Sequence, residues 1–129
     1  MLAIDTNILV RYLTGDHPEQ SAKARDLIDS HQIYVSRTVL LECEWVLRSA
    51  YAFNGPDIAR ALRKFAGLEQ VSVEAPAETA LALDRTEAGM DFADALHLGA
   101  IGACEALLTF DRKFIKAAEA SGTTKVREP

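Results

Sequence analysis

Cysteine is scarce in this sequence, and long apolar runs and an excess of basic charge are missing. The 129 residues include 2 cysteines, Cys43 and Cys104, which are too few and too far apart for a zinc ribbon or a redox motif. Both lie in apolar stretches, so we expect buried free thiols in a reducing cytoplasm. No apolar run approaches the roughly 20 residues that a membrane helix needs, and residues 1–5 lack signal-peptide features. The sequence predicts a soluble, cytoplasmic protein without membrane contact.

The charge balance is acidic, with 14 basic and 19 acidic residues and a net charge of -5. Proteins that coat nucleic acid by charge alone are usually basic, so the charge balance disfavours that class. It does not exclude nucleic-acid binding in one local groove. Hydrophobic residues make up 49% of the chain and charged residues 26%, which excludes a disordered or fibrous chain. The length fits a single domain over residues 1–129. Nucleophilic serine or cysteine motifs and glycine-rich phosphate loops are absent.

Turn residues divide the chain into strands that alternate with helices. Short apolar runs predict buried strands at 1–4, 33–35, 71–73 and 106–110, with a weak edge strand at 124–126. Helices are predicted at 6–13, 18–30, 38–52, 56–66, 76–88, 91–103 and 114–120, the second capped by Asp16 and the third by Ser36. This alternation predicts the α/β class, with a parallel sheet that has helices on both faces. Ligands of such sheets bind beyond the carboxyl ends of the strands.

Acidic side chains follow two of these strands directly. Asp5 comes after the first strand and Asp111 after the strand at 106–110, so each carboxylate is expected at the edge where such sheets keep their sites. The alternative for each is that it caps the following helix. Arg112 and Lys113 come next to Asp111 and could hold a polyanion there, or form a solvated helix face.

Glu42 lies within one of the most apolar stretches of the chain. A lone carboxylate beside an apolar stripe is costly unless it is paired or bound to metal, although Glu42 could also lie at the edge of the stripe and reach water. Glu44 competes for the same role, and helical spacing alone does not choose between them.

Asp91 and Asp94 open a predicted helix at positions i and i+3. The simplest interpretation makes Asp91 the cap and places Asp94 in the first turn, where the helix dipole favours it. The small residues that follow Asp94 would bring this helix close to the sheet. Converging carboxylates would repel one another, and bound Mg²⁺ or Mn²⁺ would remove that repulsion. Acids in this arrangement suggest metal-assisted phosphodiester chemistry.

Four segments of the chain, taken in order, together form a pattern that can be compared with known families. They are Ile4-Asp5-Thr6-Asn7, then Val39-Leu40-Leu41-Glu42 with Trp45-Val46-Leu47, then Asp91-Phe92-Ala93-Asp94-Ala95-Leu96, and finally Leu108-Thr109-Phe110-Asp111-Arg112. In kind and spacing they resemble the PIN-domain ribonucleases, and among these the VapC toxins of bacterial and archaeal toxin–antitoxin pairs. The segments extend from one end of the chain to the other, and four pieces at compatible spacing are a specific signal.

The resemblance implies a three-layer α/β/α sandwich, a homodimer and an antitoxin partner of the VapB kind. The four acids of the family fall on Asp5, Glu42 rather than Glu44, Asp94 and Asp111. Asp5 and Asp94 would be the core ligands of Mg²⁺ or Mn²⁺, and RNA phosphodiesters would be hydrolysed by metal-activated water. Supporting roles fall on Thr6, Asn7 and Thr109, which would orient the acids. Asp91 also has a supporting role, because it ranks below Asp94 as a metal ligand.

Three other classes compete with this interpretation. An aspartate-nucleophile phosphatase of the haloacid dehalogenase kind would use Asp5, but it needs a second aspartate where this chain has Asn7. A receiver domain would need an acidic pair at the first strand and a lysine after the last strand. A non-catalytic PIN-like interaction module would share the fold and use its acidic groove to hold a basic peptide.

Overall fold

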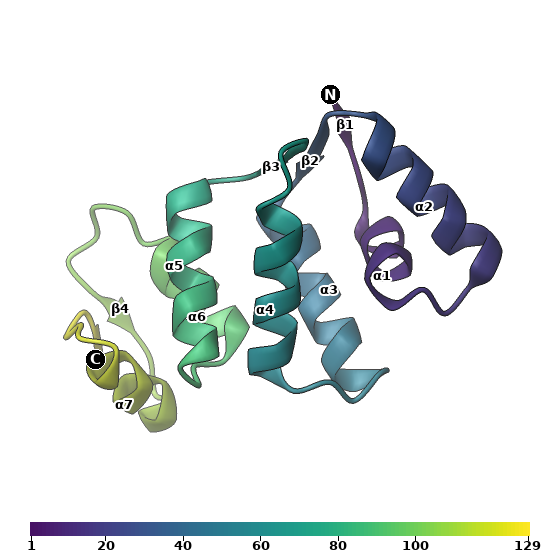
Figure 1. The fold of residues 1–129 in the computed structure, drawn as a ribbon. Coiled ribbons are helices and arrows are strands. Elements are labelled where there is room, and N and C mark those ends of the chain that lie inside the picture. The colour runs from purple at the N-terminus through teal and green to yellow at the C-terminus, as the bar shows by residue number, and fades with distance from the viewer.

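The computed structural model describes all 129 residues and contains seven helices and five short strands, which confirms the α/β class. Figure 1 shows their arrangement along the chain. The strands are β1 (Leu2–Ala3), β2 (Ile33–Val35), β3 (Val71–Val73), β4 (Leu107–Leu108) and β5 (Val126–Arg127). The helices are α1 (Thr6–Thr14), α2 (Pro18–Ser30), α3 (Arg37–Ser49), α4 (Gly55–Ala66), α5 (Pro76–Glu87), α6 (Phe92–Gly99) and α7 (Arg112–Ala120).

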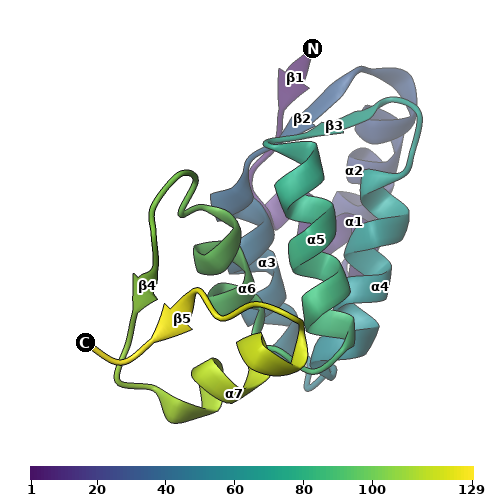
Figure 2. The same cartoon turned by 90° about the vertical axis from the view of Figure 1, so that its left-hand side faces the viewer.

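All strand pairs are parallel, as predicted, but the strands form two sheets. The first has the order β1-β2-β3, with Leu2 opposite Ile33 and Ile33 opposite Val71. The second contains β4 and β5, with Leu107 opposite Val126. Figure 2 shows the second sheet standing apart from β1, β2 and β3. β1 and β4 therefore do not pair with each other within one chain.

The core lies where the helices pack on one another and on β2. Ile33 and Val35 of β2 are fully buried, as expected for a strand with a neighbour on each side. Helix α4 buries Ile58, Leu62 and Phe65, which are spaced along one helical face. Burying a side chain such as Phe65 contributes about 2–3 kcal/mol to folding. This apolar packing fixes the helices on which the acidic residues stand.

Most helix boundaries follow the sequence signals, but the α2 cap and the ends of α3 and α6 differ, and α3 ends at Ser49, three residues before the predicted end at 52. Ser36 caps α3 as predicted, accepting a hydrogen bond from the Val39 N–H at 3.3 Å. The α2 cap is His17 rather than Asp16, because the Asp16 carboxylate instead binds the hydroxyl of Tyr51 and the side chain of Arg11. Helix α6 ends at Gly99, four residues before the predicted end at 103, and a turn at residues 100–106 leads to β4.

The segments at 1–4 and at 106–110 are not the buried strands that their apolar residues predict. Both residues of β1 are exposed, and only Ile4 after it is buried. Leu108 is 56% exposed and Phe110 is 84% exposed. The physical reason is that β4 pairs with β5 on one side, while no strand pairs with its other edge. Cys104 of the preceding turn is exposed as well, whereas Cys43 is buried as expected, and both thiols are free. No helix combines the length and the apolar character that a bilayer crossing requires.

Candidate functional site

The acids predicted from the sequence lie in two groups, the first around the end of β1. Asp5 caps α1 by accepting a hydrogen bond from the Ile8 N–H at 3.3 Å. The next residue, Thr6, is buried, and its hydroxyl donates to the Glu42 carboxylate of α3. Asp5 and Asn7 line one shallow cavity together with the basic residues Arg11 and Lys23. The hydrogen bond from Thr6 to Glu42 therefore connects the start of α1, just after β1, with α3.

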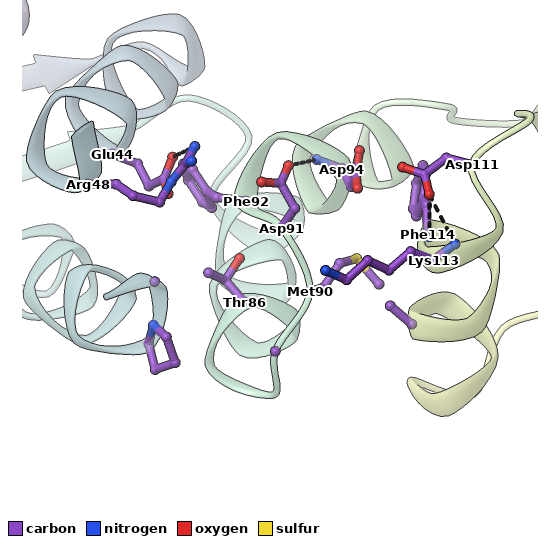
Figure 3. A pocket seen from close by; sticks show the side chains of 14 residues that line it. Glu44, Arg48, Thr86, Met90, Asp91, Phe92, Asp94, Asp111, Lys113 and Phe114 are labelled. Atoms are coloured by element: carbon purple, nitrogen blue, oxygen red, sulfur yellow. Dashed lines mark hydrogen bonds and ion pairs between the residues drawn. The ribbon is translucent and has the colours of Figure 1, made fainter. Parts of the chain in front are cut away.

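The second group lies in a cavity of about 500 Å³ formed by α3, the start of α4, the end of α5, α6 and α7. Figure 3 shows Asp91, Asp94 and Asp111 along one side of it. Asp91 caps α6 by accepting from the Asp94 N–H at 3.1 Å. Asp111 caps α7 by accepting from the Lys113 and Phe114 N–H groups at 3.0 and 3.1 Å. Capping, the alternative role considered for these acids, is thus a role they do fill.

Thr109 holds the turn that carries Asp111. Its hydroxyl oxygen accepts a hydrogen bond from the Asp111 backbone N–H at 3.0 Å. The contact is with the backbone of Asp111, so Thr109 fixes the position of the residue while leaving one carboxylate oxygen free of the cap. A role of Thr109 in orienting the Asp111 carboxylate stays a prediction.

Asp94 is the candidate acid whose protonation is affected by its surroundings. Its carboxyl pKa is raised above the ordinary value, first because the group is partly buried and then because Asp91 and Asp111 add negative charge nearby. His97 opposes the shift weakly. Asp91 at the start of α6 and Asp111 at the start of α7 both lie close enough to Asp94 to act on its pKa. A carboxylate with a shifted pKa in a cleft is typical of functional sites.

Glu44, rather than Glu42, is the carboxylate of α3 that is buried. Its side chain is 3% exposed and is paired with Arg48 one turn later, at 2.8 Å between Arg48 Nε and Glu44 Oε1. Both residues line the cavity that holds Asp91 and Asp94. The functional candidate Arg48 was not identified from the sequence, although its i,i+4 spacing from Glu44 was the available signal. Glu42 is exposed and faces Thr6 instead.

Lys113 supplies a second cation at the same cavity. It follows Asp111 at the start of α7, and Figure 3 shows its side chain extending along the cavity toward Met90. No ion pair ties the Lys113 ammonium to a carboxylate, whereas Arg48 is paired. The cavity therefore offers carboxylate oxygens on one side and a free ammonium group beside them, an arrangement suited to a phosphate group and a cation together.

The four acids Asp5, Glu42, Asp94 and Asp111 do not converge in a single pocket of one chain, contrary to the expectation. No group of three or more Asp, Glu, His or Cys side chains is placed to hold a metal ion. Carboxylate oxygens are the donors that Mg²⁺ and Mn²⁺ prefer, so the chemistry of the donors fits such an ion. Their arrangement within one chain does not, because the β1 strand that precedes Asp5 is not paired with the β4 strand that precedes Asp111.

A model of the PIN domain matches residues 2–120, which is most of the chain and includes every acid discussed above. The chain belongs to the PIN domain family. PIN domains are generally nucleases and usually use divalent metal ions, so at this level the chain is a nuclease-type hydrolase domain. Comparison with curated proteins and with solved structures found no match.

Proposed function

We propose that this PIN domain is an endoribonuclease dependent on Mg²⁺ or Mn²⁺ and the toxin of a type II toxin–antitoxin pair, related to the VapC toxins. The observation that carries the nuclease assignment is the group of Asp91, Asp94 and Asp111 beside the free ammonium of Lys113. The pKa of Asp94 is raised by partial burial and by the negative charges of Asp91 and Asp111, and a bound divalent ion would offset those charges. Lys113 would bind a phosphate of the RNA, and the carboxylates would supply oxygen donors.

The direct test is RNA cleavage by the purified protein without any partner. We expect cleavage with Mg²⁺ or Mn²⁺ that EDTA abolishes, and Asp94→Asn should reduce the rate by about 100-fold or more, since loss of outer-shell partners alone often costs up to that much. Asp26→Asn, at an exposed acid of α2, is the matched control and should retain full activity. A folded wild-type protein that cleaves no RNA under these conditions would favour a non-catalytic interaction module.

Glu42 and Glu44 can be separated by the same assay. We expect Glu42→Gln to lower cleavage while the protein stays folded, because Glu42 is exposed and hydrogen-bonded only to Thr6. Glu44→Gln should act mainly on stability, since it breaks the ion pair with Arg48. Cleavage rates and thermal unfolding of both variants check this. Loss of activity in Glu44→Gln alone would show that Glu44 is the residue of the site.

An antitoxin of the VapB kind would neutralise the carboxylates by inserting an arginine, which can pair with a carboxylate through two hydrogen bonds. Arginine and Mg²⁺ would then compete for the same oxygens, so raising Mg²⁺ should weaken antitoxin binding by linkage. The measurement is antitoxin affinity at several Mg²⁺ concentrations and constant ionic strength, which separates competition from screening. An affinity that is indifferent to Mg²⁺ would place the antitoxin away from the acids.

A further inference from the structure

The shallow cavity beside Asp5 lies between α1 and α2, and its lining is almost entirely polar. It has a volume of about 540 Å³, and Ile8 is the one apolar residue that lines it. The others are polar or charged, namely Asp5, Asn7, Arg11, Gln20 and Lys23. Figure 1 shows α1 and α2 packed side by side. Two cations in this cavity have no part in the group of aspartates around α6, so their chemistry needs a separate explanation.

The guanidinium of Arg11 is held by side chains from three segments of the chain. Its Nε donates to the side-chain oxygen of Gln20 at 2.8 Å. One terminal nitrogen donates to the Asp16 carboxylate at 3.1 Å and to the Tyr51 hydroxyl at 3.4 Å. The other terminal nitrogen makes no hydrogen bond. Because a guanidinium has five N–H donors in a rigid plane, this fixed group still has donors to offer to a ligand.

Asp16 and Ser21 keep Arg11 in this position. Hydrogen bonds from Tyr51 and Thr14, together with the charge of Arg11, hold the pKa of Asp16 below its ordinary value, so the carboxylate stays ionised at neutral pH. The buried Ser21 hydroxyl donates to the Arg11 backbone carbonyl at 2.8 Å, which ties the end of α1 to α2. An arginine that is ordered in advance loses little side-chain entropy when it binds an anion.

Lys23 is the less constrained cation of the cavity. Its ammonium pairs with Glu19 at 3.3 Å, and both side chains are 75% exposed. An exposed ion pair of this kind contributes little, so the ammonium can exchange Glu19 for another anion. Asp16 offsets part of the Arg11 charge. An anion in this cavity would therefore be held by the oriented donors of Arg11 and by the charge of Lys23 together.

The spacing along α1 relates this cavity to the acids. Arg11 follows Asp5, the cap of α1, by six residues, which is roughly 9 Å along a helix that rises 1.5 Å per residue. Successive nucleotides of a stacked strand rise about 3.4 Å, so the separation corresponds to roughly two or three nucleotides. A phosphate at Arg11 and Lys23 would thus lie along the same strand as a phosphate at Asp5.

We propose that the cavity between α1 and α2 binds a phosphate of the RNA roughly two or three nucleotides from the cleaved bond, with Arg11 as the oriented donor and Lys23 as the free cation. The identity of the strand as a substrate rests on the proposed function, whereas the phosphate contact rests on the cavity. Arg11 and Lys23 touch none of the reacting atoms in this arrangement, so their loss weakens RNA binding and leaves the chemical step intact.

Removing the charge of Lys23 tests the contact without any cleavage. Binding of a single-stranded RNA oligonucleotide by the metal-free protein is measured at several salt concentrations. We expect Lys23→Gln to lower the slope of log K against log salt by about 0.7, the value for one phosphate of a single strand. Arg25→Gln removes the same charge from an exposed residue of α2 outside the cavity, and it should keep the wild-type slope. An unchanged slope in Lys23→Gln, or an equal loss in Arg25→Gln, would overturn the proposal.

The Arg11 contact can be observed by NMR in the wild-type protein, without a substitution that disturbs Asp16. We expect the Arg11 Nε–H signal to shift when the same oligonucleotide is added, because a phosphate would polarise the guanidinium. The Nε–H of Arg63, which donates to Glu87 at 3.0 Å, is the matched control and should not move. An Arg11 signal that stays in place when the protein is saturated with RNA would overturn the proposal.

Cleavage kinetics then relate this phosphate site to the reaction. We expect Lys23→Gln to raise KM several-fold with kcat unchanged, and the effect should disappear for oligonucleotides too short to reach the cavity. A lower kcat with an unchanged KM would overturn the binding role. A wild-type protein that shows the expected slopes and NMR shift but cleaves no RNA would contradict the proposed function alone.

Discussion

Asp94 is a carboxylate that works against the stability of the fold that holds it. Burial and the charges of Asp91 and Asp111 raise its pKa, so the folded protein favours the protonated form more than the unfolded chain does. The stabilising effect of that proton is complete below the unfolded pKa, near 3.8, and is lost as the pH rises through the folded pKa. At neutral pH the charged Asp94 is therefore a source of instability.

We expect Asp94→Asn to raise the melting temperature at pH 7 in chelator-treated buffer by on the order of 2 °C, because it removes that charge. The difference from the wild type should shrink as the pH falls, since the wild-type carboxyl is then protonated too. Thermal unfolding at several pH values measures this, with Asp26→Asn as a control that should show no such trend. A constant difference at all pH values would mean that amide packing, rather than charge, is responsible.

Helix α3 shows what the sequence can and cannot predict about an element. Its cap, Ser36, and its existence follow from local signals, because they depend only on neighbouring residues. The choice between Glu42 and Glu44 does not, since apolar residues flank both and only the packed neighbours decide which face is covered. The same holds for β4, where an apolar run predicted burial but the pairing partner determines exposure. The acids were found from the sequence, whereas their separation into two groups depends on the topology.

The ion pair of α3 provides a test at this scale. Arg48→Ala would leave Glu44 buried without its cation, and we expect the free energy of unfolding to fall by about 3 kcal/mol. Arg48→Ala combined with Glu44→Gln should recover much of the loss, because the uncompensated charge is gone. Denaturant unfolding of the two single variants and the double variant gives the coupling energy. Additive losses in the double variant would show that the pair is not electrostatically coupled.

Charge over the whole molecule is net acidic, so under the proposed function an RNA substrate would have to be held by a local group of cations. Residues 111–128 hold Arg112, Lys113, Lys116, Lys125 and Arg127. Lys113 faces the acidic cavity and has no carboxylate partner, and its phosphate contact would displace condensed counterions.

We expect Lys113→Gln to weaken RNA binding and to reduce the slope of log K against log salt by about 0.7, the value for one phosphate of a single strand. Lys64→Gln, at an exposed lysine of α4, should leave the slope unchanged. Binding of a non-cleaved RNA by the metal-free protein at several salt concentrations measures both. Equal slopes for Lys113→Gln and the wild type would mean that the phosphate is held elsewhere.

The two thiols differ in a way that gives the molecule a built-in reporter. Burial, with the nearby charge of Glu44, raises the pKa of the Cys43 thiol to about 12, so this thiol stays protonated and unreactive at neutral pH. Cys104 is exposed in the turn that joins α6 to β4. A maleimide dye or spin label would therefore attach at Cys104 alone, with no engineered cysteine. The spectrum of this single label would then report on the turn before β4, in the unmodified sequence.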